Sequence, residues 1–457
     1  MNRRLLITLS TAIVLIAGTY AAIQFAKGYR PNLQTREIQG TGLLVLNSTP
    51  KGAQVLIDGK LTTATDDTIN LPPGEYEVEI KKDGYISWKK TLTIQAELVR
   101  QANARLFPAV TDLRPLTFTG AKNLSPSPDG QKIIYAVTQS SEEVKKGLWI
   151  LDLVERPLSL SKEPRQIARN TESLDFTRAI LGWSPDSNQV LTHFSADEKT
   201  KKSLEQNILL DASDFNRQES LRDATARLPL VFSQWEEQLA RKINDQLLEL
   251  PLEMQKIATA SATNLYFSPD DQKLMYTATR EVEIPKGLIP PLPSTSTQRQ
   301  ERSIKPGSVY VYDIKEDTNF LILETSAPAE LGEPGTRMLL IDQIIPRTLF
   351  TPEASPSAHT KLQEGTTAET IAEFKAQYTP ITTQSLQWFP DSNHLILTEE
   401  GNVSILEYDG TNRATIYTGQ FENQFAYPWP DGSKLLILTN LNVESDLPPN
   451  IYAIKLK

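Results

Sequence analysis

The turn Ser127-Pro128-Asp129-Gly130 decides the fold of this chain, because it comes back four times. Proline fixes φ near −65°, aspartate bonds the backbone just ahead of it, and glycine or serine closes the turn. A turn that returns at intervals of about 40 residues or more is typical of a repeat architecture. The later copies are Ser184-Pro185-Asp186-Ser187, Ser268-Pro269-Asp270-Asp271, Phe389-Pro390-Asp391-Ser392 and Trp429-Pro430-Asp431-Gly432.

Each turn joins two strands that are apolar on both faces. The fifth and sixth residues after every proline are apolar, as in Ile133-Ile134. Neighbouring residues of a strand point to opposite faces, so a sheet with this pattern is stacked between two others. We expect a third strand after each hairpin and a fourth at residues 165–168, 255–258, 320–323 and 414–417.

Four antiparallel strands in each unit predict the blades of a β-propeller. The last unit reaches Lys457 after its third strand, whereas residues 113–118 form a strand with no blade of their own. We predict that this strand pairs with the C-terminal strand and closes the ring, which removes exposed sheet edges. An open β-solenoid or two β-sandwiches are the alternatives.

The S-P-D-G turn, with a strand such as Val309-Tyr310-Val311-Tyr312 downstream, resembles the TolB-type β-propeller, which is built from WD40-like repeats. The resemblance covers residues 109–457 and implies a fold, not a function. Five blades are expected, and a sixth, degenerate blade within 325–380 is the alternative. That second long insertion includes a candidate strand at 338–341 and a candidate helix at 367–377.

Residues 40–108 form a separate, compact β unit. Strands are expected at 43–46, 54–57, 76–80 and 88–94, with turns at Asp58-Gly59, Pro73-Gly74 and Asp83-Gly84. The stretch from Ser48 to Gly59 resembles the PEGA domain, although Lys51 stands where the family has glutamate. The resemblance implies an extracytoplasmic module whose ligand is not generally established.

The chain begins with an uncharged, mostly apolar stretch at residues 5–26, long enough for a helix that spans a bilayer. A cleaved signal is the alternative, but no small-x-small cleavage site follows the apolar core. We therefore expect residues 1–39 to be a membrane anchor and a polar tether. The expected location is the cell membrane, with one pass and the bulk of the chain outside the cytoplasm.

Composition and charge exclude several classes of protein. The sequence has no cysteine, which excludes disulfides, thiolate metal sites, cysteine nucleophiles and a lipoprotein anchor. The first 36 residues hold five basic and no acidic residues, which leaves 42 basic against 56 acidic residues in the remainder. This acidic balance argues against nucleic acid as a partner.

A helical insertion separates the second and third repeats, at about residues 214–250. Ser233 and Glu236 fit a capping box, and Pro251 ends the pattern. One interpretation is a helix that packs against the ring; the other is a docking helix for a partner. A further proline-rich insertion at 285–307 is expected to be a mobile, partly extended loop. The apolar stripe of the helix consists of Phe232, Trp235, Leu239, Ile243 and Leu247.

No catalytic or cofactor motif is present. The chain has only His193, His359 and His394, and no pair of them has the spacing of a helical zinc site. The aspartates of the repeats are interpreted as caps of their turns, because a calcium loop needs several oxygen ligands in one short segment. The expected cofactors and metals are therefore none. These aspartates are Asp129, Asp186, Asp270, Asp391 and Asp431.

These observations predict a non-catalytic, membrane-anchored binding or scaffold protein of the cell envelope. The propeller would hold an envelope protein, peptide or glycan, with the PEGA unit as an accessory module. The alternative is an envelope hydrolase with a site in the propeller channel. Shifted carboxyl pKa values in a pocket at the channel mouth would favour that alternative.

Overall fold

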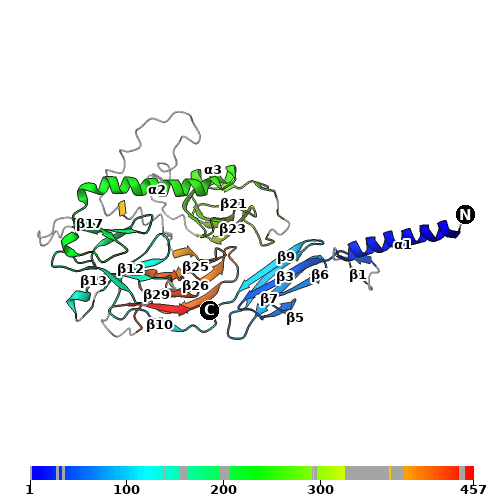
Figure 1. The fold of residues 1–457 in the computed structure, drawn as a ribbon, viewed down its shortest axis with the longest axis horizontal. Coiled ribbons are helices and arrows are strands. Elements are labelled where there is room, and N and C mark those ends of the chain that lie inside the picture. The colour runs from blue at the N-terminus through cyan, green and yellow to red at the C-terminus, as the bar shows by residue number, and fades with distance from the viewer. Residues whose placement is uncertain are drawn as a thin grey trace, which may run out of the picture. The chain divides into compact units, whose positions relative to one another are not determined.

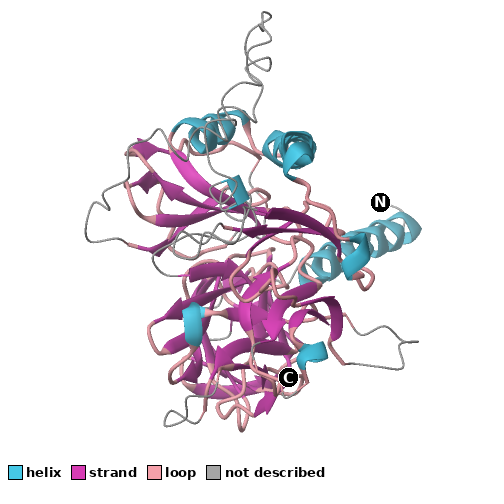
Figure 2. Ribbon diagram, turned by 90° about the vertical axis from the view of Figure 1, so that its left-hand side faces the viewer, coloured by secondary structure: helices cyan, strands magenta, loops and turns pink. Residues whose placement is uncertain are grey.

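The computed structural model describes residues 3–26, 30–32, 37–137, 139–140, 142–154, 163–195, 206–290, 292, 296–324, 370–371, 385–441 and 448–457. The chain divides into two compact units (Figure 1). The first consists of residues 1–110 together with 289–299, and the second of residues 111–288 and 300–457. Strands make up most of both units, as predicted (Figure 2).

The chain begins with helix α1 (Arg3–Ala26), and a short hairpin of β1 (Arg30–Asn32) and β2 (Glu37–Gln39) follows it. The helix is confirmed, but the predicted membrane span at 5–26 is not supported. Among the described residues, no helix combines the length and the apolarity that crossing a bilayer requires. Within α1, the hydroxyls of Ser10 and Thr11 donate back to the carbonyl of Ile7.

The first unit contains two packed sheets. Strands β6, β3 and β9 form one sheet, and β5, β4, β7 and β8 form the other. Their shared core includes Leu44, Val55, Val78, Ile80 and Trp88. The strands are β3 (Gly42–Thr49), β4 (Gln54–Ile57), β5 (Lys60–Ala64), β6 (Asp67–Leu71), β7 (Gly74–Lys81), β8 (Trp88–Ile94) and β9 (Val99–Arg105).

The four strands expected here coincide with β3, β4, β7 and β8, whereas β5, β6 and β9 were not predicted. The reason is local, since β5 exposes nearly all of its side chains and has no apolar alternation. Asp58 and Gly59 both have positive φ, 48° and 75°, as a tight hairpin between β4 and β5 requires. Turn chemistry is therefore easier to recognise in this unit than its exposed edge strands.

The second unit contains five antiparallel sheets of three or four strands in its described residues. The predicted first, second and third strands are all confirmed, since each S-P-D-type turn joins the first strand of a sheet to the second. Residues 325–369 and 372–384 lie outside the described residues, so the number of blades stays a prediction. Four of the sheets are β11 (Lys122–Pro126), β12 (Lys132–Val137), β13 (Gly147–Asp152), β14 (Arg165–Arg169); β15 (Ile180–Trp183), β16 (Gln189–Phe194), β17 (Gln206–Asp211); β18 (Ala262–Phe267), β19 (Lys273–Ala278), β22 (Val309–Asp313), β23 (Thr318–Leu323); and β24 (Ser385–Trp388), β25 (His394–Glu399), β26 (Asn402–Glu407), β27 (Ala414–Thr418).

The fifth sheet joins the two ends of the unit. It consists of β28 (Ala426–Pro428), β29 (Lys434–Thr439), β30 (Asn450–Lys455) and, from the start of the unit, β10 (Leu113–Pro115). Leu113 lies opposite Ile454, and Pro115 lies opposite Tyr452. The predicted closure by the first strand is confirmed, which argues against the open solenoid.

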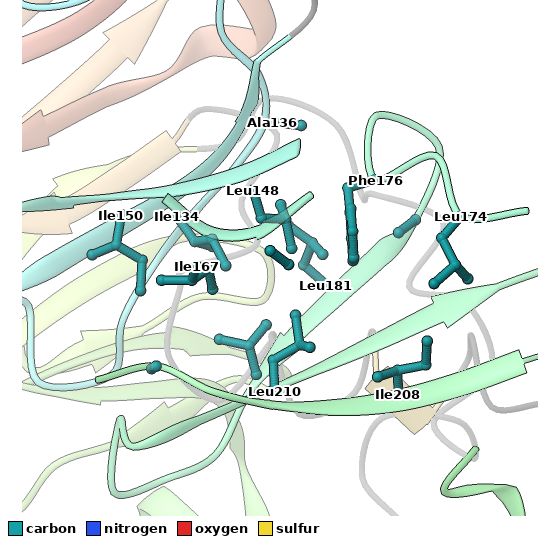
Figure 3. Close-up of a cluster of buried hydrophobic side chains, with 14 of the residues drawn as sticks. Ile134, Ala136, Leu148, Ile150, Ile167, Leu174, Phe176, Leu181, Ile208 and Leu210 are labelled. Carbon is teal, nitrogen blue, oxygen red and sulfur yellow. The ribbon is translucent and has the colours of Figure 1, made fainter. Parts of the chain in front are cut away.

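Neighbouring sheets pack face to face. In one core, Ile134, Leu148 and Ile150 of the first sheet meet Leu181 and Leu210 of the second (Figure 3). On its other face the first sheet packs against the fifth, and the third sheet packs against the fourth. The adjacent apolar pairs after each turn therefore serve two different cores, as the sequence pattern indicated.

The second sheet departs from the four-stranded pattern. Its predicted fourth strand, 255–258, is wrong, because these residues lie in helix α3 (Leu252–Ala260). Met254, Ile257 and Ala258 are buried at helical spacing, which a short apolar run does not distinguish from a strand. Strands β14, β23 and β27 confirm the other three predicted fourth strands.

Helix α2 (Leu228–Leu248) occupies the predicted helical insertion. It begins five residues before Ser233, so the predicted capping box is wrong; Pro229 instead stands in the first turn. Pro251 lies beyond the end of α2 and serves as the N-cap of α3. Helix α2 therefore begins earlier in the sequence than the predicted capping box indicated.

The other two insertions are only partly described. Within 285–307, β20 (Val282–Glu283) pairs with β21 (Ser303–Ile304), and residues 289–299 belong to the first unit. The contacts of residues 297 and 298 with that unit correct the expectation of a freely mobile loop. Within 325–380, only residues 370–371 are described, and they are helical, as predicted; the strand expected at 338–341 lies outside the described residues.

Candidate binding site

The repeated turns share one pattern of hydrogen bonds. In the first, the Ser127 hydroxyl donates to Asp129 Oδ1 at 2.5 Å, and Asp129 Oδ1 also accepts from the Gln131 N–H at 3.0 Å. Ser184 with Asp186, and Ser268 with Asp270, repeat this pattern. Where serine is absent, Asp391 and Asp431 still accept main-chain N–H groups two residues further on.

These bonds leave the aspartates suited to structure and not to acid catalysis. Burial alone would raise the pKa of Asp186, but hydrogen bonds from Ser184 and Asn188 outweigh it and hold that pKa below its usual value. Burial also opposes ionisation of Asp270, and bonds from Ser268 and Gln272 again hold its pKa low. A general acid needs the opposite shift.

The turns also connect one sheet to the next. The Asp129 N–H donates to the Ser187 hydroxyl of the following turn, and Lys132 Nζ donates to the Ser187 carbonyl. Between the third and fourth sheets, the Asp270 N–H donates in the same way to the Ser392 hydroxyl. Hydrogen bonds therefore link successive S-P-D-type turns to one another. This leaves the opposite ends of the strands for binding.

The histidines do not form a metal site in the part of the chain that is described. His193 Nδ1 lies 2.9 Å from Asn207 Oδ1, and His394 Nδ1 lies 2.9 Å from Asp391 Oδ2. His359 lies outside the described residues. Among the described residues, no group of three or more His, Asp or Glu side chains is arranged to hold a metal ion.

The apolar stripe of α2 is covered by the chain itself. Trp235 and Leu239 are buried against Leu191 of β16, and Phe232 packs on the same cluster. Ile243 and Leu247 continue the stripe into the core of the third sheet, so α2 extends from the second sheet to the third (Figure 1). Docking through these side chains would first require the helix to lift off, so the geometry favours the packing interpretation.

A polar cavity of about 720 Å³ lies at the end of the strands opposite the turns. It is formed by the beginnings of β11, β15, β28 and β30 and by the ends of β12 and β29. The fifth, first and second sheets all contribute, so the cavity exists only when the sheets are assembled around the closure. Its lining residues are Ala121, Lys122, Asn123, Gln139, Thr177, Arg178, Ala179, Glu422, Asn423, Leu438, Pro448 and Pro449.

The charged groups of the cavity are exposed and mostly unpaired. Within the described residues, Lys122 and Glu422 have no ion-pair partner, while Arg178 lies 3.6 Å from Asp175. Among the lining residues that the structure describes, Glu422 is the single carboxylate. Glycoside hydrolysis uses a pair of carboxylates, so this lining offers no specific support for the hydrolase alternative.

Asn123 shapes the wall of the cavity. Its φ of 55° coincides with a register shift between Lys122 and Ser125, where β11 departs from β12. Its side-chain amide donates to the carbonyls of Phe176 and Ala179, which fixes the start of β15 against β11. Asn423 on the facing segment also has a positive φ of 54°. Such backbone at a cavity is consistent with a binding site.

Two large apolar side chains are exposed, each three residues along the chain from a lining residue, Ala121 or Leu438. Phe118 is 79% exposed, and Leu441, which follows the end of β29, is 57% exposed. The loop that carries Phe118 is held on both sides, because Thr117 Oγ1 and the Gly120 N–H both donate to Asn450 Oδ1. Phe118 is thus an aromatic ring presented to solvent by a fixed loop.

Sequence reasoning did not find this site. The described lining comes from six separated segments, and the polar residues in it belong to no motif. The available signal was Asn123, because asparagine at the same place before a turn recurs as Asn264 with φ 51°. That repetition indicates a bulge in the first strand of a sheet, but not which bulge borders a cavity.

The comparisons with known proteins give one family and many solved structures, two of which are TolB structures. The PEGA domain family matches residues 41–109. No curated protein matches the chain in sequence. The structure of a putative TolB from Agrobacterium tumefaciens is 12% identical, with a TM-score of 0.21, over 73% of this chain and 78% of that protein.

The structure of TolB from Acinetobacter baumannii is 10% identical, with a TM-score of 0.21, over 92% of this chain and 64% of that protein. The chain therefore spans less than two thirds of that TolB. Likeness at these TM-scores carries no argument, so the propeller interpretation depends on the order of the strands and on the β10–β30 closure. Residues 41–109 of this chain form a PEGA domain.

Proposed function

We propose that this chain is a non-catalytic binding and scaffold protein of the cell envelope, whose cavity holds an extended segment of a partner protein. The single observation that carries the proposal is the cavity of about 720 Å³, together with the exposed ring of Phe118 three residues before the lining residue Ala121. Cavities of this size hold small ligands or short stretches of peptide.

The chemistry of the lining favours a peptide over a glycan. The amides of Gln139 and Asn423 offer both donors and acceptors, and the register shift in β11 turns main-chain groups away from the ladder. No aromatic ring is among the described lining residues, and the exposed ring of Phe118 lies outside that lining. A peptide can use the amide of Gln139, the amide of Asn423 and the displaced main-chain groups of β11, since its own backbone pairs with free strand edges.

Phe118 supplies the apolar anchor that a protein partner needs. Aromatic residues dominate the binding energy of interfaces, and a ring on a loop fixed by Asn450 loses little conformational entropy on binding. Leu441 extends the apolar rim. The cavity would then orient the bound segment, and Phe118 would contribute most of the affinity.

The location outside the cytoplasm is part of the same proposal, and the resemblance of the PEGA domain to surface modules supports it. Protease added to intact cells should degrade the chain, and a cytoplasmic control protein should survive. Complete protection of the chain in intact cells would contradict the location without touching the binding site.

Site-specific photo-crosslinking in intact cells tests the binding function. Gln139 and Gln131 are both exposed and flank the same strand, β12, at its cavity end and its turn end. A photoreactive residue at 139 should capture a partner protein, and the same residue at 131 should not. Equal adducts at both positions, or none at 139, would rule the proposal out.

A further inference from the structure

Strand β6 lies at the open edge of a sheet in the PEGA domain. The order of that sheet is β6-β3-β9, and β6 pairs with β3 on one side only. In the part of the chain that the structure describes, no other strand pairs with its outer side. Asp67, Thr68 and Asn70 are exposed, while Ile69 and Leu71 are half-buried. An exposed edge of this kind is a template for pairing with another strand.

The main-chain groups of Thr68 and Asn70 point away from the sheet. The N–H of Leu43 donates to a carbonyl just before β9, so the main chain of Leu43 is directed towards β9. Main-chain groups alternate in direction along a strand, so those of Leu44 are directed towards β6, where Ile69 lies opposite. Ile69 is therefore bonded to β3, and the residues on either side of it present their N–H and carbonyl groups to the open edge.

The carboxylate of Asp67 occupies one of these outward groups. Its Oδ2 accepts from the Thr63 hydroxyl at 2.5 Å, and its Oδ1 accepts from the Thr68 N–H at 2.8 Å. The bond from Thr63, followed by that from Thr68, holds the pKa of Asp67 below its ordinary value, so the side chain is charged at neutral pH. A strand that adds here must offer a carbonyl to the Thr68 N–H and keep its own carboxylates away from Asp67.

A second copy of β6 meets both conditions. In an antiparallel pair centred on Ile69, Thr68 of each copy lies opposite Asn70 of the other, and Asp67 lies opposite Leu71. Because the main chains of Thr68 and Asn70 both point outward, each such pair exchanges both of its N–H···O bonds. No two carboxylates are opposed, and Ile69, which packs on the core of the domain, lies opposite its own copy.

We infer that β6 is the edge at which two copies of this chain join their PEGA sheets into one continuous sheet. The register is defined by the strand itself. Centring the pair on Thr68 would leave Asn70 without a partner in β6, and centring it on Asn70 would leave Thr68 without one. The inference goes beyond the proposed function, because it concerns a surface of the PEGA domain and does not involve the cavity.

Cysteine trapping tests this register, because the sequence has no cysteine of its own. Full-length Thr68→Cys and Asn70→Cys are mixed, oxidised and separated on a non-reducing gel. Opposed residues of a hydrogen-bonded pair lie about 5.5 Å apart between Cα atoms, which a disulfide spans. Two copies of the same residue are displaced along the strands, beyond the limit of about 7 Å. The mixture should therefore give on the order of tenfold more linked dimer than either variant alone.

Two further cysteine variants identify the occupant of the edge. Ile69→Cys lies opposite its own copy, so it should link to itself when cells that produce the chain are oxidised. Gln101→Cys is the matched control, because Gln101 is exposed on β9 of the same sheet and reports chance collisions. Linked dimer no higher than this control, or a linked product with a different protein, would overturn the inference.

A main-chain substitution tests the pairing without cysteine. Asn70→Pro removes an N–H that points away from β3, so it leaves the β3–β6 ladder intact and blocks pairing at the open edge. It should lower the dimer association constant on the order of tenfold in analytical ultracentrifugation. Asn70→Ala keeps the N–H and should associate like the wild type. Equal association of the proline and alanine variants would show that the dimer does not use this edge.

Discussion

The indole N–H of Trp183 donates a hydrogen bond of 3.0 Å to the main-chain carbonyl of Ser125 on the neighbouring sheet. Trp388 makes the same bond, of 3.1 Å, to the carbonyl of Tyr266 one sheet earlier. Both tryptophans stand directly before an S-P-D-type turn, so the repeat includes a bond between sheets as well as a turn within one. These two bonds tie the second sheet to the first and the fourth sheet to the third.

We predict that Trp183→Phe lowers the free energy of unfolding by about 1–3 kcal/mol, because it leaves the buried Ser125 carbonyl without its donor. Trp183 is almost completely buried, so water does not replace the indole. Chemical denaturation followed by circular dichroism measures the loss. Trp429→Phe is the control: Trp429 is half-buried, and its indole N–H has no hydrogen-bond partner among the described residues, so the cost should be smaller.

Lys273→Met should destabilise the protein by about 3 kcal/mol at neutral pH, because it leaves the buried carboxylate of Asp313 without its cation. Lys273 Nζ lies 3.8 Å from Asp313 Oδ2, and both side chains are 7% exposed. Adding Asp313→Asn should recover most of the loss. Equal stability of the single and double variants would contradict this account of the pair.

The cost of Lys273→Met should depend on pH. Burial raises the pKa of Asp313 above its ordinary value of 3.8, and Lys273 opposes that rise. A carboxyl with a raised folded-state pKa binds protons more strongly in the native state, so its contribution to stability falls as pH rises through that pKa. In the Lys273→Met variant, this loss of stability with rising pH is larger. The destabilisation that the substitution causes, measured by denaturation, should therefore shrink as the pH drops towards 3.8 and grow above it.

Gly147→Ala should cost about 3 kcal/mol or more. Gly147 has φ 144°, and an added Cβ would lie 2.1 Å from the Ala168 carbonyl oxygen and 2.8 Å from Arg169 Cα. Both atoms are main chain of the paired strand β14, which cannot move aside without breaking the ladder. Gly287→Ala is the control, because its φ is also positive, at 73°, but a Cβ there meets nothing within 4 Å. It should cost about 1 kcal/mol.

Phe118→Ala should weaken capture of a partner at position 139 roughly tenfold or more while leaving the unfolding transition unchanged. The ring is 79% exposed, so its removal leaves no internal cavity. Crosslinking yield and denaturation midpoint are measured on the same preparations. A lowered midpoint would mean that the ring packs within the chain, and an unchanged yield would remove Phe118 from the interface.

The sequence predicted what local chemistry determines. Proline, aspartate and the adjacent apolar pairs give the turns, the hairpins and the faces that pack together. The strand predicted at 113–118, with no blade of its own, led to the closure, and its observed paired part is 113–115. Ile257 and Ala258 were misassigned to a strand because four apolar-rich residues are compatible with either period. The cavity was beyond prediction, since Lys122, Arg178 and Glu422 meet only after three sheets have assembled.

The pairing of Leu113 with Ile454 joins residues 341 positions apart in the sequence. A contact of such high sequence separation costs more loop-closure entropy than the hairpins within each sheet. The closure is therefore expected to form late in folding, after the sheets that lie between the two residues. Until it forms, the first and last sheets of the unit keep edges that other strands can pair with.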